Sequence, residues 1–129
     1  MGTTRSAVTL NFVAPVLRVS DLPRSISYYR DRLGFEIDFS YEGFYASVSR
    51  DGCRVHLKCA ERDRRDQVAF ETAQHLDVCF GISNAEALAS HFVSSGADLS
   101  VPLRSMPYGH ELYVRDPDGY ILGFIQAKD

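Results

Sequence analysis

The sequence predicts an α+β protein in which two βαβββ modules form curled mixed sheets around a cleft. Strand-like and helix-like segments follow in the same order in both halves of the 129-residue chain. The two expected helix caps, Asp21 and Asn84, are separated by nearly as many residues as the two expected hairpin glycines, Gly52 and Gly119. Each half is too short to bury a sheet face alone, so the halves must share a core. The expected parts are an N-terminal extension (1–11), a first module (12–60), a linker (61–74), a second module (75–126) and a C-terminal tail (127–129).

The first module begins with the largely apolar segment Phe12–Val19, which predicts a strand. Ser20 or Asp21 can cap a helix whose apolar residues recur at helical spacing, and Gly34 provides its C-terminal stop. Asp51-Gly52 predicts a tight hairpin turn between the last two strands. Three strands are expected after the helix: Phe35–Tyr41, Phe44–Arg50 and Cys53–Cys59.

The second module repeats this order after the segment Glu61–Ala73. This segment opens with a mixed-charge run, Glu61–Asp66, that has no apolar periodicity, and it predicts a solvated linker. His75–Ile82 is the expected first strand, and Asn84 can cap a helix that ends near Gly96. Asp118-Gly119 predicts the turn of the last hairpin. The remaining strands are expected at Leu99–Leu103, His110–Arg115 and Tyr120–Gln126.

The composition excludes several classes of protein. With 45% hydrophobic and 24% charged residues, the chain has enough apolar surface to fold, which argues against intrinsic disorder. A net charge of −3 argues against general nucleic-acid binding, which needs a basic face. No apolar run approaches the length that spans a bilayer, and the first residues lack a secretory signal. We therefore expect a cytoplasmic protein with neither nucleic-acid nor membrane partners.

The chain has three cysteines, Cys53, Cys59 and Cys79, and no C-x-x-C motif. The odd count and the spacing argue against a disulfide framework or a zinc knuckle. Cys53 and Cys59 fall on one face of an expected strand and Cys79 falls on another strand, and we expect free, buried thiols.

Two motifs resemble the vicinal oxygen chelate superfamily, which contains glyoxalase I, bleomycin resistance proteins, fosfomycin resistance enzymes and extradiol dioxygenases. The first comprises Val19-Ser20-Asp21-Leu22-Pro23-Arg24-Ser25, Tyr28-Tyr29 and Leu33-Gly34-Phe35, and the second is Arg115-Asp116-Pro117-Asp118-Gly119-Tyr120. The resemblance covers residues 12–126 and implies paired βαβββ modules, a small-molecule cleft and a homodimer. It does not define the chemistry, because this fold hosts many activities.

In the metal-dependent members of the superfamily, four strands each supply one ligand. The resemblance places these positions at Ala14, His56, Asp77 and Gly123, and the internal repeat pairs them in the same way. Ala14 and Gly123 have no side chain that can bind a metal, and two ligands are too few to hold one tightly. The pattern is therefore closer to the bleomycin-resistance type, which binds its ligand without a protein-bound metal. This implies sequestration of a small molecule, such as an antibiotic, with no cofactor.

Strand alternation places Arg54, His56 and Lys58 on one face of their strand, opposite a core-like face. The basic stripe either lines a polar pocket for an anionic or carbonyl group or is a solvated surface. Aromatic side chains near the expected strands and turns can stack on a flat ligand. The complete set expected to line the cleft is Arg54, His56, Lys58, Asp77, Tyr108 and His110.

Three alternatives stay open from the sequence. His56, His75 and Asp77 can form a two-His, one-carboxylate site for a divalent Fe, Mn, Zn or Ni ion, as in a lyase or dioxygenase. Asp77 and His56 can instead act as a metal-free acid–base pair. The third alternative is a domain without catalysis or tight ligand binding that serves dimerisation or regulation.

Overall fold

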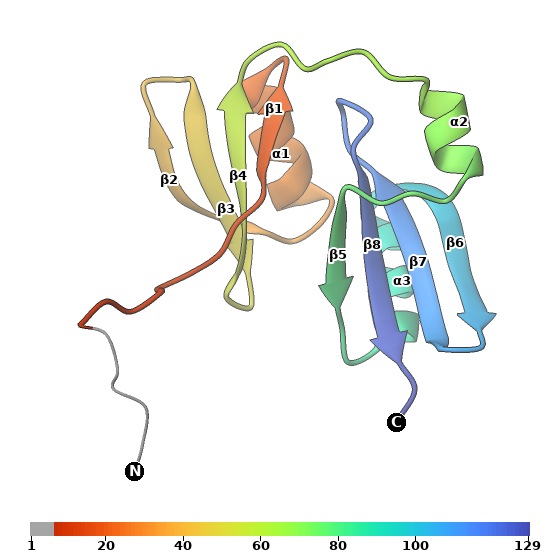
Figure 1. Ribbon diagram of the computed structural model, residues 1–129. Helices are drawn as coiled ribbons and strands as arrows, with labels where there is room; N and C mark the ends of the chain where they lie inside the picture. Colours follow the sequence, from red (N-terminus) through yellow and green to blue (C-terminus); the bar gives the residue numbers. More distant parts are fainter. Residues whose placement is uncertain (1–6) are drawn as a thin grey trace.

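The computed structural model describes residues 7–129 and confirms the two βαβββ modules (Figure 1). Residues 1–6 of the expected N-terminal extension lie outside the described residues. The first module contains β1 (Val16–Val19), α1 (Leu22–Asp31), β2 (Glu36–Tyr41), β3 (Tyr45–Arg50) and β4 (Cys53–Cys59). After α2 (Gln67–Thr72), the second contains β5 (Val78–Gly81), α3 (Ala85–Ser95), β6 (Asp98–Met106), β7 (Gly109–Arg115) and β8 (Ile121–Ala127).

Both sheets have the same strand order. The first is β1-β4-β3-β2 and the second is β5-β8-β7-β6. In each, the first strand of the module runs parallel to the last, while the other neighbours are antiparallel. Figure 1 shows β1 and β5 as the facing edges of the two sheets. The internal repeat in the sequence thus corresponds to two sheets with the same strand order and strand directions.

Local signals account for the ends of α1 and α3. The Asp21 carboxylate accepts a hydrogen bond from the Arg24 N–H at 3.1 Å, and the Asn84 side chain accepts one from the Ala87 N–H at 3.0 Å. Both caps satisfy a donor that the first helical turn leaves free. Gly96 ends α3 with φ of 79°, a left-handed conformation that glycine adopts without strain.

The expected hairpin between β3 and β4 is confirmed. Asp51 and Gly52 both have positive φ, 51° and 81°, as a two-residue type I′ turn requires. This turn sets the register that pairs Ser47 with His56 and Ser49 with Arg54. The side chains of these residues therefore project from the same face of the first sheet.

Helices α1 and α3 pack on one face of the two sheets and bury a core that both modules share. Tyr29 of α1 and Phe92 of α3 are fully buried, as their spacing predicts. The Phe35 and Phe80 rings, one from each module, lie 6.0 Å apart in an edge-to-face contact. The Tyr29 hydroxyl donates to Asp116 of the second module at 2.8 Å. We call the opposite side of each sheet its open face.

Three expected boundaries require correction. The first strand begins at Val16 rather than Phe12, because its pairing with β4 starts with Val16 opposite His56 and the preceding Pro15 has no N–H to donate. The strand expected at His75–Ile82 is shorter, Val78–Gly81, whereas the strand expected at Leu99–Leu103 extends over Asp98–Met106. The linker contains a helix, α2, that the sequence did not predict.

The expectation of buried thiols is wrong, because all three cysteines are free but exposed. Cys53 and Cys59 are the first and last residues of β4, and only its middle, at Val55 and Leu57, is covered by the core. Cys79 lies on the open face of β5, because its neighbours Val78 and Phe80 pack toward the core. Over residues 7–129, none of the helices is long and apolar enough to cross a bilayer.

Candidate functional site

The open face of the first sheet carries the predicted stripe of Arg54, His56 and Lys58. Val55 and Leu57, which alternate with them, are fully buried beneath the helices. His56 is also buried, with 9% of its surface exposed, whereas Lys58 is exposed. The stripe therefore differs in exposure along its length, and His56, at its centre, is the buried residue.

Aromatic rings surround the His56 imidazole. Its Nδ1 lies 2.8 Å from the Tyr45 hydroxyl, in a hydrogen bond whose direction depends on the imidazole tautomer. The Phe12 ring lies 5.5 Å from the imidazole and the Phe39 ring 6.0 Å, both measured between ring centroids. The Nε2 atom is buried and makes no hydrogen bond to any described residue. A buried polar atom without a partner is rare, and it is a natural contact point for a ligand.

Arg54 and Asp38 lie at the side of this aromatic group that is nearest the β3–β4 turn. The Arg54 guanidinium lies over the Phe12 ring, 4.3 Å from its centroid, in a cation–π contact. The Ser49 and Ser47 hydroxyls each donate to Asp38 at 2.7 Å, and these hydrogen bonds lower the pKa of that carboxyl. The result is a small aromatic and polar site of mixed charge, which we call the His56 site (Phe12, Phe39, Tyr45, Arg54 and His56).

Asp77 does not join the His56 site. Its carboxylate accepts two hydrogen bonds from the Arg65 guanidinium, at 2.8 and 2.9 Å, and one from the Ile121 N–H at 2.7 Å. This bidentate pair occupies both oxygens. The sequence analysis allowed a pairing with a basic residue of the cleft, but the partner comes from the segment between the modules.

Tyr108 and His110 belong to another cluster, centred on Glu111 of β7. The Tyr108 hydroxyl donates to the fully buried Glu111 carboxylate at 2.6 Å, and Arg104 donates to it from Nε at 2.8 Å. Burial opposes ionisation of Glu111, but these hydrogen bonds together lower its pKa. The same contact raises the pKa of Tyr108 to about 12. His110 is exposed and contacts Ser105, with Oγ and Nδ1 3.0 Å apart.

The sequence missed Arg104 as a partner of Glu111. The two residues face each other across the β6–β7 pair, but the register shifts twice between Leu99 and Arg104. An unbroken alternation could therefore not have paired them.

The four positions that hold a metal in other members do not fit one here. Ala14 has no donor atom, and both Asp77 oxygens are bound by Arg65. A Cβ added to Gly123 would lie 2.6 Å from the Leu76 Cδ1, so a side chain there would displace Leu76. The alternative ligand His75 instead contacts the Phe70 ring, 5.4 Å between centroids. No group of three His, Cys, Asp or Glu within residues 7–129 is placed to hold a metal ion.

Comparison with known proteins identifies the family. The sequence profile of the Glyoxalase/Bleomycin resistance protein/Dioxygenase superfamily matches residues 9–124. The chain belongs to this superfamily. Its two βαβββ modules are the fold of the structurally similar members, as the sequence motifs predicted. No curated protein sequence gives a significant match.

Several solved structures superpose over nearly the whole chain. The bleomycin-binding protein of bleomycin-producing Streptomyces verticillus, in complex with copper(II)-bleomycin, is 28% identical with a TM-score of 0.69, covering 94% of this chain and 99% of that one. A glyoxylase/bleomycin resistance protein/dioxygenase domain from Frankia sp. EAN1pec is 21% identical with a TM-score of 0.67, covering 95% and 100%. TioX from Micromonospora sp. ML1 is 18% identical with a TM-score of 0.69, covering 92% and 98%.

Proposed function

We propose that the protein is a cytoplasmic, homodimeric binding protein that sequesters a small aromatic molecule at the His56 site, without a bound metal and without chemical change. The observation that carries this proposal is the buried, unpartnered Nε2 of His56 inside a ring of aromatic side chains. The 28% identity to a bleomycin-binding protein supports an antibiotic of that kind as the ligand class.

The site offers two kinds of contact to such a ligand. The Phe12 and Phe39 rings are about half exposed, so a flat group can stack on them. Once a ligand displaces the rings packed against the imidazole, His56 Nε2 can form a hydrogen bond to one of its polar atoms, and Arg54 can supply a charged donor beside it. The pairing of Asp77, the carboxylate considered as an acid–base partner of His56, with Arg65 supports binding without catalysis.

A homodimer would complete the site. Three large aromatic side chains on and beside β2 are 43–57% exposed and contact one another or Tyr45: Phe39, Tyr41 and Phe44. Such a cluster on one sheet is typical of a surface that a partner covers. Phe39 belongs to both the cluster and the His56 site. A second copy bound to the cluster would therefore also enclose a ligand at the His56 site. Sedimentation velocity of the intact protein tests this, and a monomer at all concentrations would contradict it.

Titration calorimetry with copper(II)-bleomycin and metal-free bleomycin tests the function. We expect saturable binding to the wild-type protein and recovery of the ligand unchanged by mass spectrometry. His56→Ala should weaken binding about tenfold, because one buried hydrogen bond contributes on the order of 1–2 kcal/mol. The matched control is His75→Ala, which removes another imidazole outside the site and should leave the affinity unchanged.

Two results would contradict the proposal. Equal losses in His56→Ala and His75→Ala, with near-stoichiometric metal in the purified wild-type protein, would instead favour the site of His56, His75 and Asp77. An absence of binding by either form of bleomycin, followed by an absence of hits in a thermal-shift screen of other antibiotics, would remove sequestration as the function.

A further inference from the structure

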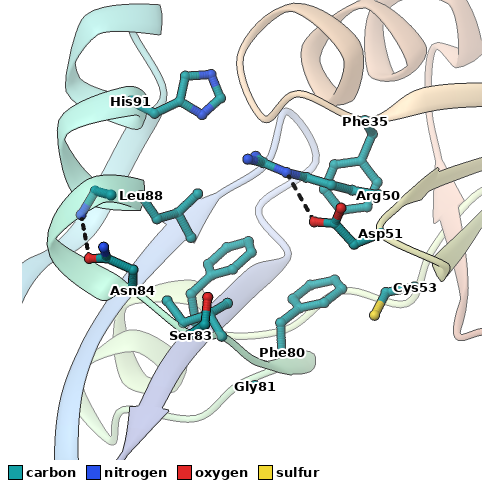
Figure 2. A pocket seen from close by; sticks show the side chains of 13 residues that line it. Phe35, Arg50, Asp51, Cys53, Phe80, Gly81, Ser83, Asn84, Leu88 and His91 are labelled. Atoms are coloured by element: carbon teal, nitrogen blue, oxygen red, sulfur yellow. Dashed lines mark hydrogen bonds and ion pairs between the residues drawn. The ribbon is translucent and has the colours of Figure 1, made fainter.

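A concave site lies between the two modules, away from the His56 site. It is a cavity of about 590 Å³ beside α3, bounded on its other side by the β3–β4 hairpin (Figure 2). This volume lies within the range of cavities that hold small organic molecules. Arg54, His56 and Lys58 do not line it.

The floor of the cavity is aromatic. The Phe80 and Phe124 rings are stacked, with their centroids 4.9 Å apart and their planes 10° from parallel. Phe35 meets Phe80 edge-to-face from the first module, and Leu88 of α3 adds an aliphatic wall. A flat apolar group can lie against this floor with ring-to-ring contact.

Two hydrogen-bond donors converge on one wall, from different modules. A Cβ built on Gly34 would lie 3.0 Å from Arg50 Nη1 and 3.1 Å from His91 Cε1, so the guanidinium and the imidazole approach the same point. Figure 2 shows Arg50 and His91 reaching toward each other above the Phe80 ring. The shared wall joins the end of β3 to the middle of α3.

These donors are largely unused. Arg50 donates from Nη1 to the Leu33 carbonyl at 2.7 Å, which leaves most of its five N–H groups free. Its nearest carboxylate is Asp51, 3.8 Å away and 91% exposed, which is a weak surface pair. Within residues 7–129, no hydrogen bond to the His91 ring is formed. A ligand that brings acceptor atoms to this wall would meet unsatisfied donors.

At the start of α3, two backbone donors are already used. The Ala87 N–H is taken by the Asn84 side chain at 3.0 Å, and the Ala85 N–H by the Gln126 side chain at 2.8 Å. An anionic group in the cavity is therefore directed to Arg50 and His91. We propose that this cavity binds a flat aromatic carboxylate, with its rings on the phenylalanine floor and its carboxylate on Arg50 and His91. This site shares no residue with the His56 site and is independent of the proposed function.

Amide-resolved NMR titration of the wild-type protein with naphthalene-2-carboxylate tests the site, and 2-naphthylmethanol serves as the neutral counterpart. We expect saturable shifts at Phe80, Leu88 and His91, with the acid bound at least about tenfold more tightly than the alcohol because only the acid pairs with the guanidinium. Equal affinities would overturn the carboxylate assignment. Shifts confined to the residues around His56 would overturn this cavity and would support the His56 site instead.

A pair of tryptophan variants on α3 tests the location. Ala87 is exposed and lines the cavity, so Ala87→Trp should fill it and weaken naphthalene-2-carboxylate binding at least about tenfold. Ser90 is exposed on the same helix and does not line the cavity, so Ser90→Trp should bind as the wild type does. Equal binding by both variants would overturn the site.

Alkylation of the wild-type protein gives a readout that needs no variant. Cys53 lines the cavity, whereas Cys59 and Cys79 are exposed elsewhere. Saturating naphthalene-2-carboxylate should slow alkylation of Cys53 severalfold and leave the other two rates unchanged, as resolved by peptide mass spectrometry. Unchanged Cys53 reactivity at saturation would count against the cavity as the binding site.

Discussion

One buried carboxylate, Asp116, holds the last turn of the chain and joins the modules. It accepts hydrogen bonds from the backbone N–H groups of Asp118 and Tyr120, both at 2.9 Å, and from the Tyr29 hydroxyl at 2.8 Å. Only 4% of its surface is exposed, and burial raises its pKa to about 6 even though these three hydrogen bonds act in the opposite direction. The sequence motif indicated a turn here, but it did not indicate that the turn's aspartate reaches α1.

Replacing Asp116 should change the pH dependence of stability. Because its pKa rises on folding, the folded state binds more protons than the unfolded state between the ordinary value of 3.8 and about 6. The stabilisation that protonated Asp116 gives to the folded state is complete below this pH window and is lost as the pH rises through it. In the wild-type protein, this titration should lower the free energy of unfolding by about 3 kcal/mol across the range, at 1.36 kcal/mol per pH unit. Asp116→Asn should abolish that decrease. Urea unfolding from pH 4 to 7 measures the difference.

Asp63→Asn is the control, because the Asp63 side chain is 94% exposed. Its pH profile should follow that of the wild type. A profile of Asp116→Asn that also follows the wild type would contradict the assignment of the titration to Asp116.

The candidate site shows what sequence reasoning could and could not reach at this scale. Alternation along β4 placed His56, Arg54 and Lys58 on one face, and the structure agrees. It could not supply the Phe12 ring, because Phe12 was expected in a strand and lies outside β1. It could not foresee that Asp77 is bound by Arg65, because the linker has no periodicity from which to orient a side chain.

Among the elements, α2 is the one that the sequence did not predict. It has no fully buried residue, so no apolar stripe marks it in the sequence. Its stability comes from polar contacts: the Asp66 side chain accepts from the Ala69 N–H at 3.0 Å, and Glu71 accepts from Arg115 Nε at 2.9 Å. Glu71 thus attaches the segment to Arg115 of the second sheet.

Glu71→Gln should loosen α2 without unfolding the protein. The hydrogen bond from Arg115 lowers the pKa of Glu71 to about 2, so its stabilising effect is present above the ordinary value of 4.5 and is lost as the pH falls toward 2. Hydrogen exchange at pH 7 should show lower protection of α2 amides in the variant than in the wild type. The remaining helices should keep their protection, because the shared core does not include α2.

Glu36→Gln, at an exposed position of β2, is the matched control and should leave the protection of α2 unchanged. The wild-type protein should lose protection in α2 between pH 5 and 3, once intrinsic exchange rates are taken into account. Protection that is insensitive to both the variant and the pH would show that the Glu71–Arg115 pair does not hold the helix.

At the scale of the whole molecule, the repeat made the fold predictable. Caps, stop glycines and hairpin turns are local signals that recur in the same order, and the structure has two sheets of identical strand order. How the modules dock was not predictable, because it depends on single long-range contacts. The Tyr120 hydroxyl, for example, donates to the Arg18 carbonyl at 2.8 Å and accepts from the Arg18 N–H at 3.1 Å. No pattern within either half indicates this bridge.

The shared core predicts that the two modules unfold together. Phe35 is 3% exposed and is the first module's aromatic contact with Phe80 of the second, so Phe35→Ala removes packing from both at once. The cost should be about 3–5 kcal/mol, as for other buried phenylalanines. Amides of both sheets, followed by NMR through a urea titration, should keep one common midpoint that falls in the variant. Val93→Ala, at a position 68% exposed on α3, should leave that midpoint nearly unchanged. If the first sheet lost its signals at a lower urea concentration than the second, the modules would be separate folding units. The contact between Phe35 and Phe80 would then join two independently folded modules and would not be part of one core.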